Sequence, residues 1–138
     1  IGGEGNGGVI YPESHFGRDA LVGAALFLSH FAKFRNGERK TVSQLTAQYN
    51  NYHISKNKIE LSAEMDVDDI LAKVKLKYQK YPQNTIDGLK IDFENEWVHL
   101  RKSNTEPIIR IYSESESEST AEHLAAKIIS DIREIIKS

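Results

Sequence analysis

The most chemically distinctive segment of the sequence spans residues 101–110, reads RKSNTEPIIR, and joins two stretches with strand-like alternation. Arg101 and Arg110 carry planar guanidinium groups, each of which can pair with two phosphate oxygens. A turn between them can also direct several backbone N–H groups inward. The remaining polar donors of the segment are Ser103, Asn104 and Thr105. These residue types predict a site for a phosphate monoester, although the composition alone also fits an ordinary polar hairpin turn.

A second distinctive segment lies at the start of the chain, where five of the first eight residues are glycine. The sequence begins with Ile1 inside this glycine-rich loop rather than with Met, and its first residues do not have the pattern of a signal peptide. We therefore expect the chain to be part of a larger cytoplasmic protein.

An unusually apolar helix is predicted over about 19–34, after a short extended segment at 9–12. Asp19 is placed to cap its N-terminus. Apolar residues recur around much of its circumference, so this helix needs cover on more than one side. The preceding residues are too few to supply that cover. We therefore expect its natural neighbours in a missing upstream part, with 1–36 as the loop-strand-helix remnant of an α/β domain.

A linker is predicted after this helix. The polar, glycine-containing stretch 35–40 ends the helix, and Thr41 with Gln44 has the spacing of a capping box for a short second helix. Residues 49–58 then have the composition of a connector. The predicted organisation is a first part over 1–36, a short helix and linker over 37–55, and a compact domain over 56–138.

The compact domain combines strand-like alternation with helical periodicity. Strands are predicted at 59–63, 89–94, 97–101 and 108–112, and helices at 66–78 and from Ser119, which forms a second capping box with Glu122. The order is strand, helix, three strands, helix. It predicts an α+β fold, an antiparallel four-stranded sheet with helices on one face.

Composition and the remaining polar clusters exclude several functions. A formal charge of −2 gives no global basic field, which argues against nucleic-acid and membrane partners, and the absence of cysteine excludes thiolate metal sites. The five histidines show no paired ligand spacing, so no metal site is predicted in this chain. We expect the carboxylates of Asp66, Asp68 and Asp69 to cap a helix. The acidic run 113–118 is predicted to be a solvated loop.

The motif Arg-x-Ser-Asn-Thr-Glu-Pro followed by Arg110 closely resembles the phosphate-binding loop of the α-D-phosphohexomutases, the phosphoglucomutase, phosphomannomutase and phosphoglucosamine mutase family. The segment 2–8 is similar to the sugar-binding loop in the third of that family's four domains, and 87–98 is similar to its fourth domain. The two motifs stand in the family's order and at about its separation. The resemblance implies that 1–36 ends the third domain and that 56–138 is the C-terminal phosphate-binding domain.

The resemblance also assigns roles to single residues. Glu4 would accept hydrogen bonds from sugar hydroxyls, and Asn6 stands where many members have serine. Gly8 stands where those members have a histidine that lies near the reacting phosphate. This version of the loop is similar to the branch of phosphoglucosamine mutases and phosphomannomutases, and we favour the former. The residues that match the phosphate-binding loop are Arg101, Ser103, Asn104, Thr105 and Arg110.

The family reaction moves a phosphoryl group between the 1- and 6-hydroxyls of a hexose through a bisphosphorylated intermediate. It uses a phosphoserine in the first domain, Mg²⁺ held in the second, and a glucose or glucosamine bisphosphate as activator. Neither the phosphoserine motif nor the motif that holds Mg²⁺ occurs in this sequence. The resemblance therefore implies that this sequence contains no catalytic residue and no metal ligand. It implies a fragment that binds a hexose phosphate but does not convert it.

Two other functions fit the sequence. One is a stand-alone, non-enzymatic module that binds phosphate or carbohydrate. The other is an interaction domain that uses the apolar helix at 19–34 as its interface. In the fragment the same helix is a candidate contact for a homodimer, whereas in the family it would pack against the missing N-terminal domains.

Overall fold

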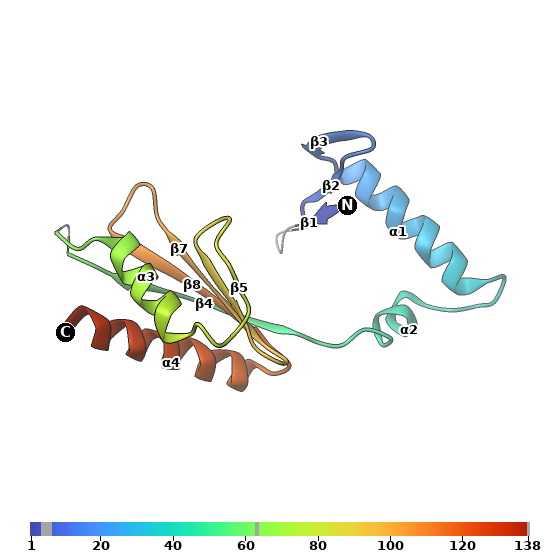
Figure 1. Cartoon of the computed structure of the whole chain (residues 1–138). Coiled ribbons are helices and arrows are strands. Elements are labelled where there is room, and N and C mark those ends of the chain that lie inside the picture. The colour runs from blue at the N-terminus through green and yellow to red at the C-terminus, as the bar shows by residue number, and fades with distance from the viewer. Residues whose placement is uncertain (4–6, 63, 138) are drawn as a thin grey trace. The chain divides into compact units, whose positions relative to one another are not determined.

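The computed structural model describes residues 1–3, 7–62 and 64–137, and the chain divides into two compact units, Ile1–Asn50 and Asn51–Ser138 (Figure 1). No helix among these described residues is both long enough and apolar enough to cross a membrane.

The first unit contains a small antiparallel sheet and two helices. Its strands are β1 (Gly2–Gly3), β2 (Val9–Tyr11) and β3 (His15–Arg18), in that spatial order. Helix α1 spans Ala20–Arg35 and α2 spans Val42–Thr46. The Asp19 side chain accepts hydrogen bonds from the N–H groups of Leu21 and Val22, both at 2.9 Å, which confirms the predicted N-cap of α1. The predicted capping box of Thr41 and Gln44 is also present at α2.

Helix α1 buries none of its residues within the described structure, although most of them are apolar. Leu21 is 83% exposed and Leu28 is 60% exposed. The helix therefore exposes the apolar surface expected from its sequence, and what covers that surface stays a prediction.

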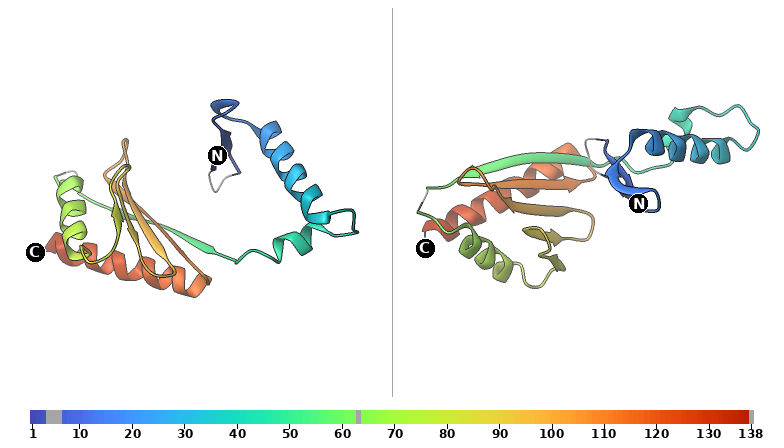
Figure 2. Two further views of the ribbon diagram at one scale, coloured as in Figure 1. Left: turned by 45° about the vertical axis from the view of Figure 1, so that its right-hand side comes forward. Right: turned by 90° about the horizontal axis from the view of Figure 1, so that it is seen from above.

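The second unit is an α+β layer. Its sheet has the strand order β4-β8-β7-β6-β5, and every neighbouring pair is antiparallel. The strands are β4 (His53–Glu60), β5 (Gln83–Asn84), β6 (Leu89–Asp92), β7 (Trp97–Lys102) and β8 (Ile108–Ser115). Helices α3 (Val67–Lys77) and α4 (Glu118–Lys137) contribute to one apolar cluster with alternate residues of these strands. Both helices therefore cover the same face of the sheet (Figure 2).

We call the helix-covered side of this sheet the inner face and the opposite side the open face. Ile109 and Ile111 of β8 and Leu100 of β7 are fully buried on the inner face. The neighbouring residues in the two strands, Arg110 between the isoleucines and Arg101 after Leu100, are exposed on the open face. This alternation places charged residues on the open face, together with Ile54, Trp97 and Tyr112.

The sheet has five strands rather than the predicted four. The additional strand is β5, whose Gln83 and Asn84 pair with Ile91 and Lys90 of β6. Two polar residues show no alternation, so the sequence carried no signal for this strand. It forms because the chain returns from α3 alongside the edge of β6.

The predicted connector at 49–58 is also wrong, because β4 begins at His53. Ser55 and Asn57 occupy its inner-face positions and lysines occupy the positions between them. An amphipathic pattern made of small polar and charged residues does not show the apolar alternation by which strands are recognised.

The acidic run 113–118 is only partly a loop, because β8 continues to Ser115. Ser113 is fully buried and its hydroxyl donates to the carbonyl of Ala121 at 2.7 Å, while Glu114 on the open face accepts from the Trp97 indole at 2.8 Å. The alternation of serine and glutamate is thus a strand pattern. Helix α4 begins at Glu118, and Ser117 rather than Ser119 accepts from the N–H of Thr120.

A polar cluster joins the two helices of the second unit. Lys77 Nζ lies 2.7 Å from Asp131 Oδ1, and the Tyr78 hydroxyl donates to the same carboxylate. Burial would raise the pKa of Asp131, but the hydrogen bonds from Lys77 and Tyr78 outweigh it and hold the pKa below its usual value.

Candidate functional site

The loop between β7 and β8 carries the predicted phosphate-binding residues, and backbone hydrogen bonds fix both of its ends. The N–H of Ser103 donates to the carbonyl of Ile108 at 3.1 Å, which closes the hairpin. The N–H of Leu61, just beyond β4, donates to the carbonyl of Pro107 at 2.9 Å. The loop is therefore anchored to two neighbouring strands.

Two of the predicted hydroxyls lie together in this loop. The oxygens of Ser103 and Thr105 are 3.5 Å apart, and the Thr105 N–H also lies 3.5 Å from the Ser103 hydroxyl oxygen. Ser103 is 9% exposed, whereas Asn104 and Thr105 are exposed. This small turn thus offers hydroxyl and backbone donors within one anion's reach.

The two predicted arginines are direct cross-strand partners. Arg101 of β7 pairs in register with Arg110 of β8, and both side chains are exposed on the open face. Arg101 Nη2 lies 2.9 Å from Asp87 Oδ2, while Arg110 forms no ion pair within residues 1–3, 7–62 and 64–137. Like charges placed opposite each other on a sheet are destabilising. An anion bound over this pair would relieve that repulsion.

Asp87 was not singled out by sequence reasoning, and a glycine explains its position. Gly88 has a φ of +78°, and a Cβ there would lie 2.2 Å from the carbonyl oxygen of Leu100. Only glycine allows this close approach of the turn to β7. The His99 Nε2 atom lies 2.5 Å from the Asp87 carbonyl oxygen. The turn therefore lies beside Arg101, a proximity that separation in the sequence does not reveal.

Lys58 adds a third cation that sequence reasoning missed. It is the register partner of Arg110 on the β4 side, so Lys58, Arg110 and Arg101 form a row across three adjacent strands. We call these three residues the basic row. Lys58 Nζ lies 3.0 Å from Glu60 Oε1, and this hydrogen bond raises the pKa of Lys58. The residue escaped notice because 49–58 was predicted to be a connector.

The carboxylates at the start of α3 have structural roles, as predicted. The Asp66 side chain accepts hydrogen bonds from the N–H groups of Asp68 and Asp69, at 2.9 and 3.4 Å. Asp68 also lies 2.7 Å from the Lys102 Nζ, and that hydrogen bond raises the pKa of Lys102. The last residue of β7 is thus tied to α3 on the inner face, beneath the loop.

The predicted sugar-binding residues Glu4 and Asn6 lie outside the described residues. In the described part of the first unit, His15 Nε2 lies 3.0 Å from Asp19 Oδ2, and His15 Nδ1 accepts a hydrogen bond from the Gly17 N–H at 3.0 Å. His15 therefore supports the cap of α1.

Comparison with known proteins places this geometry in a family. The family described as "Phosphoglucomutase/phosphomannomutase, C-terminal domain" matches residues 55–130, which include all of β8, β7 and the loop between them. This match covers more than half of the chain. The chain therefore belongs to the phosphoglucomutase/phosphomannomutase family.

Curated relatives agree along nearly the whole chain. A phosphoglucomutase/phosphomannomutase of Thermococcus kodakarensis is 40% identical, with 99% of this chain and 29% of the relative covered. A phosphoglucosamine/phosphogalactosamine mutase of Sulfurisphaera tokodaii is 33% identical, with 97% of this chain and 28% of the relative covered. The chain thus spans less than a third of the length of these relatives.

A solved structure shows the same fold. The crystal structure of a phosphoglucomutase/phosphomannomutase family protein from Burkholderia thailandensis matches with a TM-score of 0.62 at 24% identity. It covers 98% of this chain, which corresponds to 27% of that protein.

Proposed function

We propose that this chain is the C-terminal part of a cytoplasmic phosphohexomutase, an enzyme that interconverts hexose 1-phosphates and hexose 6-phosphates. Phosphoglucosamine mutase is the favoured activity, followed by phosphomannomutase and phosphoglucomutase. The observation that carries the proposal is the cross-strand pair Arg101 and Arg110 beside the clustered Ser103 and Thr105 hydroxyls. The matching family and relatives support it.

In this proposal the loop holds the phosphate that is not transferred. Arg110 supplies a guanidinium that has no ion-pair partner among the described residues, and Arg101 exchanges its Asp87 partner for phosphate oxygens. The loop hydroxyls and Asn104 supply the remaining hydrogen bonds. Binding the distant phosphate orients the other end of the sugar toward the reacting group, so that remote binding energy contributes to catalysis. No residue of this chain takes part in the phosphoryl transfer itself.

We propose that Glu4 and Asn6 contact the sugar hydroxyls. This assignment rests on the family resemblance of the glycine-rich loop. In this proposal the first unit supplies the contacts to the sugar hydroxyls, and the second unit binds the phosphate.

Mg²⁺ and a hexose bisphosphate activator are proposed for the full-length enzyme. In the part of the chain that the structure describes, no three histidine or carboxylate side chains lie together as metal ligands would. The Mg²⁺ ligands are proposed to come from a domain outside this chain.

The exposed apolar helix α1 is proposed to pack against other domains of the full-length enzyme. In the isolated chain the same surface would form a homodimer. Sedimentation of the chain with and without residues 1–36 tests this, because the shorter chain should be monomeric.

The direct test of the proposed function is a titration of the 138-residue chain with glucosamine 6-phosphate, followed by backbone amide NMR. Chemical-shift changes should concentrate at 101–110, with additional changes at the glycine-rich loop if that loop contacts the sugar. Inorganic phosphate is the matched control for the sugar contribution. Changes confined to other regions, or none, would contradict the proposal. Equal binding of phosphate and sugar phosphate would instead favour a plain anion-binding module.

A further inference from the structure

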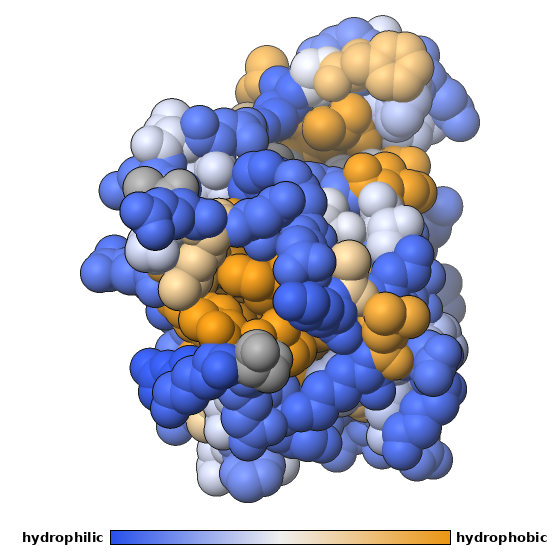
Figure 3. Space-filling view, turned by 60° about the vertical axis from the view of Figure 1, so that its left-hand side comes forward, coloured by the Kyte–Doolittle hydropathy of each residue, from blue (hydrophilic) through white to orange (hydrophobic). Residues whose placement is uncertain are grey.

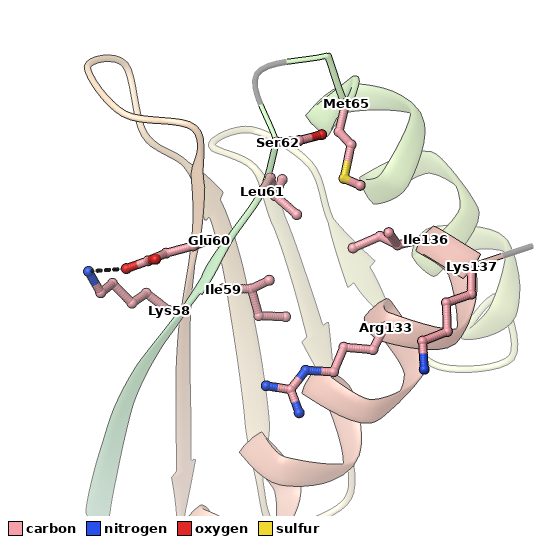
Figure 4. Close-up of a pocket in the computed structure, with 9 residues that line it drawn as sticks. All are labelled: Lys58, Ile59, Glu60, Leu61, Ser62, Met65, Arg133, Ile136 and Lys137. Atoms are coloured by element: carbon pink, nitrogen blue, oxygen red, sulfur yellow. Dashed lines mark ion pairs between the residues drawn. The ribbon is translucent and has the colours of Figure 1, made fainter.

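The second unit contains a cavity that the phosphate site does not use. It has a volume of about 450 Å³ and lies between the end of β4 and the last turn of α4. Its walls are Ile59 and Leu61 from the strand side, Met65 from the following loop and Ile136 from α4 (Figure 4). Figure 3 brings this side of the unit forward and shows apolar residues at the base of a hollow with hydrophilic residues around it. The volume lies within the range of small-molecule sites.

Two cations from α4 border this cavity. Arg133 points from the helix toward β4, and Lys137 lies one turn further along beside it (Figure 4). Neither side chain forms an ion pair with any described residue, and both are exposed. The bordering carboxylate, Glu60, points away on the far side of β4 and pairs with Lys58. The cavity therefore combines an apolar wall with two cations that have no ion-pair partner among the described residues.

A cation in the last turn of a helix also complements the helix dipole. That effect explains Lys137 but gives no reason for an open apolar hollow beside it. Exposed apolar surface is costly in water, and a ligand that covered it would gain hydrophobic free energy. The charge and the apolar wall together specify an amphipathic anion.

Addition of a strand from another chain is disfavoured at this position. β4 is an edge strand of the sheet, but Lys56 and Lys58 project from it, and charged side chains on an edge strand oppose pairing with a further strand. A small ligand in the hollow needs no such pairing.

We propose that this cavity binds a small organic anion with an apolar body. The body would lie against Ile59, Leu61 and Ile136, and its carboxylate or phosphate would be held by Arg133 and Lys137. The site is distinct from the Arg101–Arg110 pair on the open face of the sheet. Lys58 of the basic row also borders the cavity, but its side chain points away and pairs with Glu60 (Figure 4).

The test uses the 138-residue chain and sodium octanoate as the probe, with amide NMR as the readout. We expect saturable shift changes at Leu61, Met65 and Ile136. Octanol, which has the same chain without the charge, should bind about tenfold more weakly, and acetate should leave these amides unchanged. Equal affinity for octanoate and octanol would overturn the proposal. So would unchanged cavity amides at the highest soluble octanoate concentration, or shifts that run along β4 from His53.

Variants separate charge recognition from general charge effects. The double variant Arg133→Gln and Lys137→Gln should weaken octanoate binding about tenfold. The matched double variant Lys33→Gln and Arg39→Gln removes the same charge from the first unit and should leave the affinity unchanged. Met65→Glu places a carboxylate at an exposed position of the wall and should abolish binding. A loss of affinity that is equal in the two double variants would overturn the assignment.

Discussion

The five-stranded sheet of the second unit presents two faces made of alternate residues of the same strands. On the inner face, Ile109 and Ile111 are fully buried beneath α3 and α4. On the open face, Arg110 stands between Lys58 and Arg101, so three cations oppose one another in register. The inner face stabilises the fold by burial, whereas the basic row places like charges opposite one another and is the surface that we propose for an anion. A change on one face should therefore have consequences that the same kind of change on the other does not.

The largest effect is expected from truncating the inner face. Ile111→Ala removes a fully buried side chain and leaves a cavity, so the free energy of unfolding should fall by about 2–5 kcal/mol. Ile54→Ala, on the open face of β4 and 46% exposed, is the matched control and should change it by less than about 0.5 kcal/mol. Chemical denaturation of the two variants measures both. Similar losses would show that the open face is packed against something in solution.

The turn that holds Asp87 should be nearly as sensitive. Gly88→Ala combines a positive φ with a Cβ 2.2 Å from a backbone oxygen, so we expect a loss of about 2–3 kcal/mol in the free energy of unfolding, with weaker phosphate binding. Gly37→Ala is the control, because its φ is also positive, at +81°, but nothing lies within 4 Å of the added Cβ. That variant should cost only about 1 kcal/mol. Equal losses would mean that the turn moves away from β7 at little cost.

The sharpest contrast between the faces comes from Arg110→Gln. Binding of glucosamine 6-phosphate should weaken by about 1.5–3 kcal/mol, because a charge-assisted hydrogen-bonding partner is lost. The free energy of unfolding should rise by about 0.2–1 kcal/mol, because the repulsion from Lys58 and Arg101 is relieved. Calorimetric titration and denaturation of the same sample measure the two quantities. A fall in both the sugar-phosphate affinity and the free energy of unfolding would show that Arg110 stabilises the fold and is not specific to the binding site.

A smaller, pH-dependent effect is expected at the helix–helix contact. Because the folded protein holds the Asp131 pKa below its usual value, this carboxylate stabilises the fold above the unfolded-state pKa of about 4. That stabilisation is lost as the pH falls through the lower, folded-state pKa. Asp131→Asn should therefore reduce the free energy of unfolding by about 1 kcal/mol at neutral pH and by progressively less in acid. Denaturation at a series of pH values tests it. A difference that stays constant with pH would contradict this account.

The sequence predicted features that depend on neighbours along the chain. The helix caps at Asp19 and Asp66 are local, and their positions were predicted from the sequence alone. The donors at 101–110 are also neighbours in the sequence, but the residue types left a polar turn open and the family resemblance favoured a phosphate site. Other features were not predicted, because they depend on strand register. They are β5, the start of β4, and the proximity of Asp87 and Lys58 to the two arginines. Register is fixed by the apolar side chains of the inner face, yet its consequences for function appear on the open face. The third cation of the basic row is therefore visible only in the folded protein.

The smallest predicted effect concerns the competition for Arg101. Asp87 holds this guanidinium at 2.9 Å, with the two side chains 47% and 63% exposed, so the pair contributes little to stability. Asp87→Asn should remove the competing carboxylate and raise the affinity for inorganic phosphate about two- to fivefold, most clearly at low salt. Asp68→Asn removes the same charge from the partner of Lys102 on the inner face and should leave that affinity unchanged. If phosphate affinity instead fell in Asp87→Asn, the carboxylate would be holding Arg101 in its binding position, and the open face would be pre-organised by its ion pair.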